Sequence, residues 1–447
     1  MQPDIEIILP AWVAPVRPAG SVLADHAVVV RDGRIESLGP RDAALAAWPQ
    51  AKRTELPGHL LIPGLVNLHT HAAMALLRGA GDDLPLQRWL EERIWPLEAR
   101  LMSDAFVHDG TLLAAWELLR GGTTCINDMY FHPDAAARAT AALGMRAALS
   151  IVVLGFATPY AADAQAYLDR GLAARERLAG APRTSFTLAP HAPYTVDDAT
   201  FGRIARLADE LDVPIHCHVH ETAKEVADGV AEHGVRPLAR LDALGVVSRR
   251  LIAVHAVHLD DADIELLARR GASVAHCPHS NLKLASGSAR TADLLARGVT
   301  VGIGTDGSAS NNRLDMLAEA RSAALLAKGA SGDAAVFGAH QALEAATLAG
   351  ARAVGLDALI GSIEPGKAAD LAAVDLSDVD FAPVFDPVSQ LIYMASREQV
   401  THVWVDGTLV VRNRQPVLAE AAEAVCQVTG RVPLWQNRAV ECVPGQR

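Results

Sequence analysis

The chain has 447 residues, of which half are hydrophobic and 21% are charged, with a formal net charge of -12. This is an ordinary globular composition, and the length suits one large α/β barrel with an appendage. The acidic balance, without any Lys/Arg-rich run, argues against nucleic acid or an anionic membrane as the main partner. The N-terminus has acidic residues where a secretory signal is basic, and no apolar stretch reaches bilayer length, so we expect a cytoplasmic protein.

Both ends of the chain have the pattern of β-sheet. Two β-rich runs flank Asp32-Gly33 near the start, and two more flank Asp406-Gly407 near the end. Asp-Gly between apolar runs is a strong hairpin signal. We therefore expect the two terminal segments to fold together into one small β domain.

Between these segments, short β-rich runs alternate with Ala/Leu/Arg-rich stretches such as residues 197–212 and 260–271, which carry apolar residues at helical spacing. This alternation predicts a parallel sheet, and eight units fit a (β/α)8 barrel better than the alternative, a doubly wound open sheet. The eight runs are residues 60–71, 123–130, 145–154, 185–194, 213–221, 251–259, 273–280 and 299–307.

The predicted fold is thus an α/β protein: a (β/α)8 TIM-type barrel with a small β-sandwich domain built from both termini. The predicted boundaries are residues 1–59 and 365–430 for the composite β domain, 60–364 for the barrel, and 431–447 for a C-terminal tail without a recognisable signal.

Histidines concentrate where barrel enzymes carry their chemistry, at the C-terminal ends of the strands. Ten of the 17 histidines lie inside or at the end of a predicted strand run, which is more than chance readily clusters there. For three of them, His216, His258 and His276, the ordinary role of a buried core histidine stays open. The ten are His69, His71, His191, His216, His218, His220, His255, His258, His276 and His279.

Three of these runs together offer the ligands of a divalent metal. His69 and His71 point the same way because side chains alternate along a strand. The fifth run offers three histidines on one face, and spacing alone does not choose between them. The eighth run ends in Asp306, which is either a ligand or an ordinary Asp-Gly turn residue. Three histidines and one carboxylate from three strands suit a catalytic zinc.

The chain resembles the amidohydrolase superfamily, in its cytosine/guanine deaminase-like branch, and within it the 5-methylthioadenosine/S-adenosylhomocysteine deaminase group. The matching pieces follow the family order from about residue 55 to 375. They are PGLVNLHTHAAM, RGGTTCINDMY, APHAPYT, HCHVHET, VHAVHL, CPHSNLKLASG, GIGTDGSASNN and EPGKAADLAAVD.

The resemblance implies a role for each candidate residue. His69, His71, His218 and Asp306 would bind one divalent ion, zinc or alternatively Fe2+. The run TLAPHAPYT lacks the lysine that bridges two metals in many relatives, which favours a single ion. The ion would lower the pKa of a water from about 16 toward about 7. Its catalytic partners would be Glu221, His255 and Asp306, and the substrate would contact Glu98, His191, Glu221 and Asp306.

The implied activity is hydrolysis of a C–N bond in a cyclic amidine. The enzyme would convert 5'-methylthioadenosine, and also adenosine or S-adenosylhomocysteine, to the inosine analogue and ammonia. Glu98 would accept hydrogen bonds from the ribose hydroxyls. The alternative for Glu98 is a charge on the surface of a helix, and the alternative for Glu221 is a solvated charge at the start of a helix. Residues 150–167, at the end of the third strand and after it, are mainly apolar and contain no arginine. Such a segment suits the methylthio group of 5'-methylthioadenosine better than the charged homocysteine tail of S-adenosylhomocysteine.

Other functions stay open at this point. The same site would serve a guanine or 8-oxoguanine deaminase, or a triazine hydrolase. A non-catalytic scaffold barrel ranks last, because such proteins lose metal ligands and this chain keeps them. The expected partner is a small purine nucleoside, and relatives lead us to expect a homo-oligomer.

Overall fold

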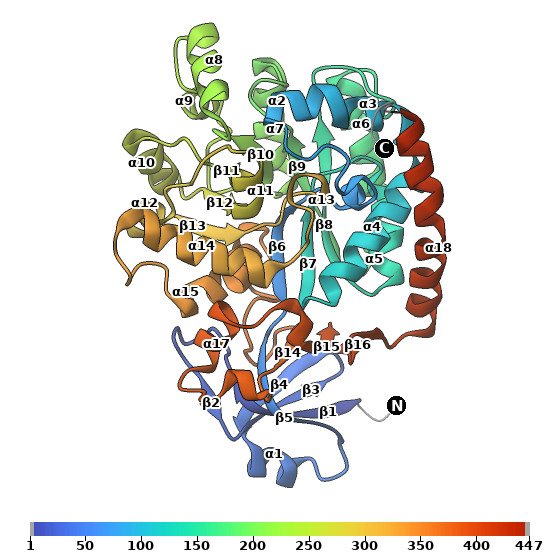
Figure 1. The fold of residues 1–447 in the computed structure, drawn as a ribbon, viewed down its shortest axis with the longest axis vertical. Helices are drawn as coiled ribbons and strands as arrows, with labels where there is room; N and C mark the ends of the chain where they lie inside the picture. Colours follow the sequence, from blue (N-terminus) through green and yellow to red (C-terminus); the bar gives the residue numbers. More distant parts are fainter. Residues whose placement is uncertain (1–3, 443–447) are drawn as a thin grey trace.

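The computed structural model describes residues 4–442, which form two sheets. The larger part is a barrel whose eight strands pair in chain order, each parallel to the next, with helices outside (Figure 1). The predicted (β/α)8 class is confirmed. The barrel strands are β6 (Leu65–Thr70), β7 (Thr123–Asp128), β8 (Arg146–Val153), β9 (Thr184–Pro190), β10 (Ile215–Val219), β11 (Leu251–His255), β12 (Ser273–His276) and β13 (Thr300–Ile303).

The first and last barrel strands meet just beyond the end of β13. The backbone N–H of Asp306 donates to the carbonyl of His69 at 3.0 Å. The side chain of Asn67 accepts from the Thr305 N–H at 3.0 Å and donates to the Thr305 hydroxyl at 2.7 Å. A Cβ on Gly304 would lie 2.9 Å from both N and Cβ of His69, so only glycine permits this approach. Closure therefore sets Asp306 beside His69.

The helices around the barrel begin where the sequence supplies caps. The Asp197 side chain accepts from the N–H of Thr200 at the start of α7, and Asp260 forms a capping box with Asp263 at the start of α10. Both predicted helical stretches are confirmed. The helices are α4 (Asp104–Leu119), α5 (Pro133–Ala142), α6 (Ala164–Arg177), α7 (Asp198–Leu211), α8 (Ala223–His233), α9 (Pro237–Ala243), α10 (Asp261–Arg270), α11 (Pro278–Lys283), α12 (Thr291–Ala296), α13 (Ser308–Asn311), α14 (Met316–Ser331), α15 (Ala339–Glu344) and α16 (Gly350–Ala353), with η3 (Ala345–Ala349) between the last two.

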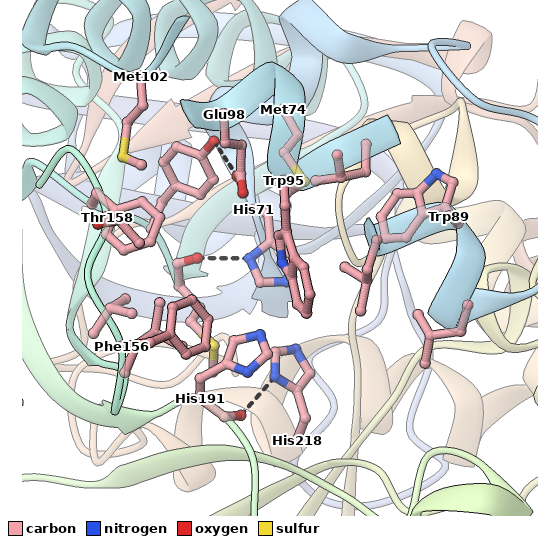
Figure 2. A pocket seen from close by; sticks show the side chains of 18 of the residues that line it. His71, Met74, Trp89, Trp95, Glu98, Met102, Phe156, Thr158, His191 and His218 are labelled. Atoms are coloured by element: carbon pink, nitrogen blue, oxygen red, sulfur yellow. Dashed lines mark hydrogen bonds between the residues drawn. The ribbon is translucent and has the colours of Figure 1, made fainter. Parts of the chain in front are cut away.

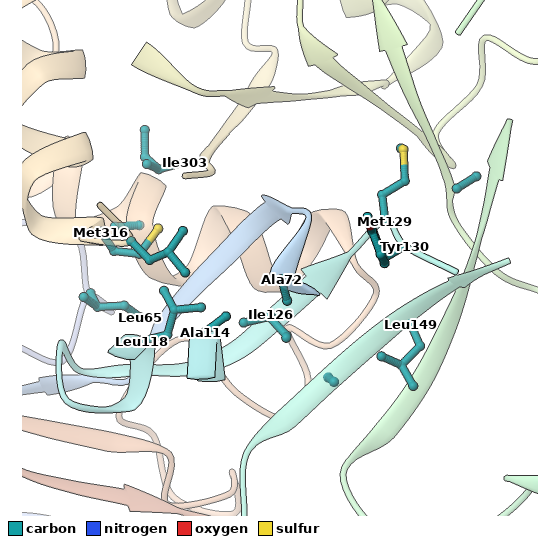
Figure 3. Packing of buried hydrophobic residues seen from close by; sticks show 14 of the residues in the cluster. Leu65, Ala72, Ala114, Leu118, Ile126, Met129, Tyr130, Leu149, Ile303 and Met316 are labelled. Carbon is teal, nitrogen blue, oxygen red and sulfur yellow. The ribbon is translucent and has the colours of Figure 1, made fainter. Parts of the chain in front are cut away.

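A long connection after β6 covers the mouth of the barrel. It contains η1 (Ala72–Leu77), α2 (Leu86–Trp89), η2 (Leu90–Ile94) and α3 (Trp95–Leu101). Helix α4 packs so closely on η1 that a Cβ on Gly110 would lie 2.2 Å from the carbonyl oxygen of Ala73. Leu65 and Leu118 are buried in the same core, which Figure 3 shows around β6 and β7. Burial of a leucine contributes about 1.5–3 kcal/mol, so this packing fixes η1 directly after the His-x-His pair.

The two chain ends share a nine-stranded sheet in which β5 and β14 pair antiparallel, with Pro63 opposite Leu371. Both predicted Asp-Gly hairpins are confirmed: Asp32 and Asp406 have positive φ, as does the glycine after each. The strands are β1 (Ile5–Val13), β2 (Leu23–Ala24), β3 (His26–Arg31), β4 (Arg34–Pro40), β5 (Lys52–Pro63), β14 (Leu371–Asp375), β15 (Val400–Val405), β16 (Thr408–Arg412) and β17 (Gln415–Pro416). The helices in these two end segments of the chain are α1 (Arg41–Ala47), η4 (Val379–Phe381), α17 (Pro387–Tyr393) and η5 (Arg397–Gln399).

Two predicted segments differ in detail from the structure. The run 60–71 is not one strand, because its first four residues end β5 in the other sheet and β6 begins only at Leu65. Gly64 separates the strands where a Cβ would collide with the Thr124 side chain. Helix α18 (Ala419–Cys442) extends through most of the predicted tail, whose residues 443–447 lie outside the described range. The predicted domain boundaries stay predictions.

Within residues 4–442, no helix combines the length and the apolar character needed to cross a bilayer.

Candidate active site

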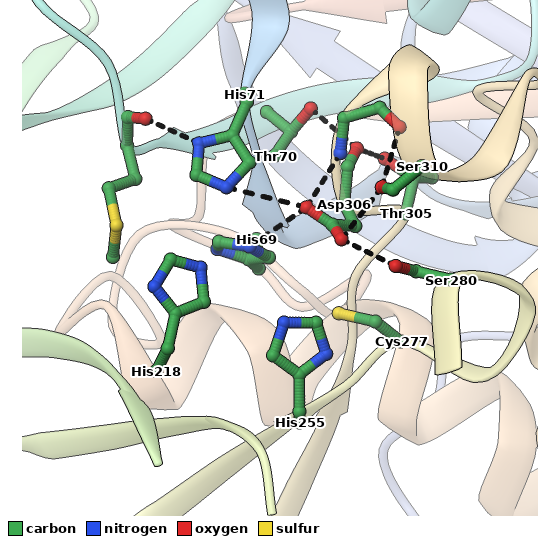
Figure 4. Close-up of polar contacts among 12 residues, drawn as sticks. His69, Thr70, His71, His218, His255, Cys277, Ser280, Thr305, Asp306 and Ser310 are labelled. Atoms are coloured by element: carbon green, nitrogen blue, oxygen red, sulfur yellow. Dashed lines mark hydrogen bonds and ion pairs between the residues drawn. The ribbon is translucent and has the colours of Figure 1, made fainter. Parts of the chain in front are cut away.

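The carboxyl ends of the barrel strands bring the predicted histidines together, and backbone carbonyls orient two of them. His71 donates from Nδ1 to the carbonyl of Met129 at 2.6 Å (Figure 4). His218 donates from Nδ1 to the carbonyl of His191 at 2.8 Å (Figure 2). A carbonyl oxygen only accepts, so Nδ1 carries the proton in both rings. Each ring therefore keeps an unprotonated Nε2, the atom that can bind a metal.

His69 and Asp306 lie at the centre of this cluster. His69 is fully buried, and its Nε2 has no hydrogen-bond partner within the described part of the chain. That atom lies 3.2 Å from Oδ1 of Asp306, and Nε2 of His71 lies 3.4 Å from the same oxygen. A buried nitrogen without a partner is costly in a folded protein. This donor set of imidazole nitrogen and carboxylate oxygen fits a divalent metal ion.

Asp306 is held by its own loop and by α11. Its Oδ2 accepts from the hydroxyls of Ser280 at 2.6 Å and Ser310 at 2.8 Å, and its Oδ1 accepts from the N–H of Gly307 at 2.7 Å. Burial raises the pKa of Asp306, but the electrostatic effect of the neighbouring imidazoles of His69, His71 and His255 outweighs burial and holds that pKa well below its usual range. Asp306 is therefore more than an ordinary turn residue. It turns the chain, and its carboxylate also faces the histidines.

Strand ends at the site are strained. His220, His255 and Asp306 have φ of 55°, 67° and 59°, in a left-handed region that residues other than glycine seldom adopt. Such backbone costs on the order of 1–3 kcal/mol per residue and concentrates at functional sites. The strain turns His255 and Asp306 toward the common centre.

The four predicted ligands, together with His255, form two overlapping groups that share His69. Ligand atoms of His69, His71 and Asp306 lie within 4.8 Å of one another, and so do those of His69, His218 and His255. The rings of His218 and His255 stack with centroids 5.4 Å apart. His255 donates from Nδ1 to Oδ1 of Asn281 at 2.8 Å. His255 thus comes as close to the centre as the residues predicted to be ligands.

Glu221 lies beside His255, with Oε2 3.8 Å from Nε2 of that ring. Burial raises the pKa of Glu221 to about 7, against the opposing effect of His255. The carboxylate of Glu225 accepts the backbone N–H of His220 at 2.7 Å and of Glu221 at 2.8 Å. Sequence reasoning missed Glu225, because an acid in the first turn of a helix is common without any such contact.

A cavity of about 250 Å³ opens above the cluster, and Glu98 of α3 lines it together with Glu221 and Asp306. The phenol of Tyr130 donates to Oε1 of Glu98 at 2.6 Å (Figure 2). Burial raises the pKa of Glu98 to about 7, although the Tyr130 hydrogen bond opposes it. Glu98 therefore faces the cavity and is not a surface helix charge. Tyr130 was missed, since one tyrosine after a strand carries no signal of its own.

The opposite wall of the cavity contains His191. Its Nδ1 donates to the hydroxyl of Thr195 at 3.1 Å, because that hydroxyl itself donates to the carbonyl of Ala192. Nε2 of His191 is therefore an acceptor. His191 lines the same cavity as Glu98 and Glu221. Its contact with the substrate stays a prediction.

Most of the remaining cavity lining is apolar. Residues after β8 line it, including Leu154 and Phe156, and Phe156 meets Trp95 edge to face with ring centroids 6.0 Å apart. Among the residues that the structure describes, no lysine or arginine lines this cavity. Arg146 lies at the start of β8 and pairs with Asp370 at 3.0 Å, at the end of the strand away from the cavity.

These features define a barrel enzyme with a candidate metal centre at its mouth. The chain belongs to the amidohydrolase family, whose profile matches residues 60–410. It is a hydrolase that acts on C–N bonds.

Several named proteins are similar to this chain over nearly its whole length. A 5-methylthioadenosine/S-adenosylhomocysteine deaminase of Teredinibacter turnerae is 47% identical over 404 residues, 90% of this chain and 91% of the relative. The enzyme of the same name from Saccharophagus degradans is 43% identical over 409 residues, 92% of each chain. The crystal structure of an adenosine deaminase from Xanthomonas campestris with bound zinc has a TM-score of 0.95 and 47% identity, covering 98% of each chain.

Proposed function

We propose that the protein is a metal-dependent deaminase that converts 5'-methylthioadenosine to its inosine analogue and ammonia, and that also accepts adenosine or S-adenosylhomocysteine. The observation that carries this proposal is the position of Glu98, which faces a cavity whose floor is the His/Asp cluster. The names of the similar deaminases support the same activity.

One divalent ion, zinc or alternatively Fe2+, would be held by His69, His71, His218 and Asp306. Three observations support this set: the inward Nε2 atoms of His71 and His218, the unpaired Nε2 of His69, and the short approach of Asp306. The zinc bound in the Xanthomonas campestris structure supports zinc as the metal at this site. When bound, such an ion supplies a water whose pKa falls toward about 7.

Two side chains would move the protons, and a third would orient the attacking water. Glu221, with a pKa near neutrality, donates a proton to the ring nitrogen beside the amino-bearing carbon. The attacking water gives one proton to Asp306, which passes it to the amino group, and ammonia leaves. Glu221 recovers a proton from the new hydroxyl as it becomes a carbonyl. His255, held through Asn281, would orient the water by its Nε2.

Two further residues would position the substrate. His191 offers an acceptor nitrogen to the purine, and Glu98 offers a carboxylate that can accept both ribose hydroxyls. A free base or a triazine has no such pair of hydroxyls, which is why a nucleoside is the preferred class.

The substituent at the 5' position would lie against apolar side chains. A cavity lined by Leu154, Phe156 and Trp95, with no cation among its described lining residues, suits a methylthio group. A homocysteine carboxylate would lose its hydration there without gaining a partner. We therefore place 5'-methylthioadenosine first among the substrates.

The test is a parallel screen of the zinc-loaded protein for ammonia release. The panel contains 5'-methylthioadenosine, S-adenosylhomocysteine, adenosine, adenine, guanine, 8-oxoguanine, cytosine and melamine. We expect 5'-methylthioadenosine to give the highest kcat/KM. A free base or melamine as the best substrate would overturn the role of Glu98, and a zinc-bound protein without activity on any compound would overturn the proposed function.

A further inference from the structure

The orientation of the His69 ring is not set by a carbonyl, unlike that of His71 and His218. Nδ1 of His69 lies 2.9 Å from Nε2 of His216, a second imidazole from β10. An imidazole nitrogen can donate or accept, so this contact alone allows the proton on either ring. The tautomer of His69 decides whether its Nε2 can bind a metal.

The direction of this hydrogen bond follows from the far end of a buried chain of polar groups. The amide nitrogen of Asn127 in β7 donates to the carbonyl of Leu68 at 3.0 Å, which fixes Oδ1 of Asn127 as an acceptor. The Thr187 hydroxyl in β9 donates to that oxygen at 3.4 Å. A hydroxyl has one proton, so Thr187 must accept in its 2.8 Å contact with Ser150 of β8.

The same reasoning continues to the metal centre. Ser150 gives its only proton to Thr187, so it accepts from Nδ1 of His216 at 3.4 Å. The other nitrogen of the neutral His216 ring is then an acceptor, and Nδ1 of His69 must be the donor. All five side chains are at most 1% exposed, so bulk solvent does not offer alternative partners.

We propose that this one-directional chain of hydrogen bonds, acting through His216, fixes the tautomer of His69 and leaves its Nε2 free to bind the metal. His216 is thus a positioning residue and not an ordinary core histidine. The chain starts at His69 and ends at the carbonyl of Leu68, its neighbour, after passing through four other barrel strands. The inference rests on the metal centre of the proposed function.

Nitrogen-15 NMR of the full-length protein, freed of metal by chelation and labelled at histidine, reads the tautomer directly. The His69 signal is identified by its loss in His69→Asn. We expect the proton on Nδ1 before any metal is added. A proton on Nε2 in the metal-free protein would overturn the proposal.

Zinc affinity, measured by competition with a chelator, tests the role of His216 in a second way. We expect His216→Leu to weaken zinc binding about 10- to 100-fold, as loss of such orienting partners does elsewhere. His216→Gln should recover much of this loss, because its amide oxygen can accept from His69. The control is His276→Leu, which removes another histidine of 2% exposure from β12 and should leave zinc affinity unchanged.

Equal zinc affinity in His216→Leu and the wild type, or an equal loss in His276→Leu, would overturn the proposal. If His216→Leu does not fold, Ser150→Ala breaks the same chain one step away and should weaken zinc binding about 3- to 10-fold. Zinc binding is measured without substrate. A protein that loses zinc affinity as expected but deaminates nothing in the panel would therefore overturn the proposed function and leave this inference standing.

Discussion

The carboxylate of Glu98 accepts a 2.6 Å hydrogen bond from the phenol of Tyr130, and both side chains line the same cavity. Tyr130 follows β7 in the barrel, whereas Glu98 lies on α3 in the connection over the barrel mouth. The contact therefore ties the covering segment to the barrel and sets the direction in which the second oxygen of Glu98 points.

Removing the phenol should weaken nucleoside binding. A hydrogen bond to a charged group contributes about 1.5–3 kcal/mol, and part of that loss is recovered when Glu98 turns to another donor. We expect Tyr130→Phe to raise KM for 5'-methylthioadenosine about 5- to 10-fold with little change in kcat. Steady-state kinetics check this, and an unchanged KM would show that Tyr130 does not position Glu98.

Nucleoside binding should depend on pH through Glu98. Because the pKa of this residue is raised to about 7, its carboxylate becomes protonated as the pH falls below neutrality and then accepts hydroxyl protons less well. We expect KM for 5'-methylthioadenosine to rise between pH 7.5 and pH 6. The profile of Glu98→Gln should be flat over that range, and parallel profiles would contradict the assignment.

The same residue should make folding stability depend on pH. The pKa of Glu98 is about 7 in the folded chain, against the ordinary value of 4.5 expected for the unfolded chain. As the pH rises, the unfolded chain therefore loses this proton at a lower pH than the folded chain does. Stability is therefore lost as the pH rises from 4.5 to 7. Relative to the wild type, we expect Glu98→Gln to gain about 1–2 kcal/mol at pH 8 and nothing at pH 4.5. Urea denaturation of the metal-free proteins at both values measures the difference.

Glu221→Gln should separate chemistry from binding. The amide has nearly the shape of the acid but cannot give its proton to the substrate ring. We expect kcat to fall about 10²- to 10⁴-fold, with zinc affinity within about twofold of the wild type. Full activity in the variant would exclude Glu221 as the proton donor, and lost zinc affinity would indicate a structural role.

Gly304→Ala should displace His69 and so disturb the candidate metal centre. The added Cβ lies 2.9 Å from N and Cβ of His69, so the β6–β13 junction must move. We expect a loss of about 1–3 kcal/mol in unfolding free energy and weaker zinc binding. Gly329→Ala is the matched control: it lies within α14 with no atom near its Cβ, and it should stabilise the protein by about 0.5–1 kcal/mol. Equal effects of the two changes would contradict the closure argument.

Sequence reasoning predicted the barrel, the two hairpins and the histidine-bearing strand ends, because alternating elements and Asp-Gly turns are local signals. It did not separate β5 from β6, since residues 60–63 and 65–68 are both mainly apolar and both have the composition of strands. Only the space around Gly64, a property of the folded chain, marks the change of sheet.

The supporting residues of the site could not be predicted in the same way. His216 has the same alternation and burial as a core histidine, and its contact with His69 depends on two strands that lie 147 residues apart in the chain. Glu225 has the pattern of a helix-opening acid, and Tyr130 that of any residue after a strand. Their roles depend on distances across the barrel, which spacing along one strand does not contain.

The pairing of Pro63 with Leu371 has a consequence for how the protein is made. On the ribosome, β5 is synthesised long before β14. The edge of β5 that pairs with β14 therefore stays unpaired while the whole barrel is synthesised. A ribosome that stalls before β14 leaves a nascent chain with an open, apolar sheet edge. We expect such stalled chains to recruit chaperones. The edge of β5 becomes covered only after β14 has been synthesised.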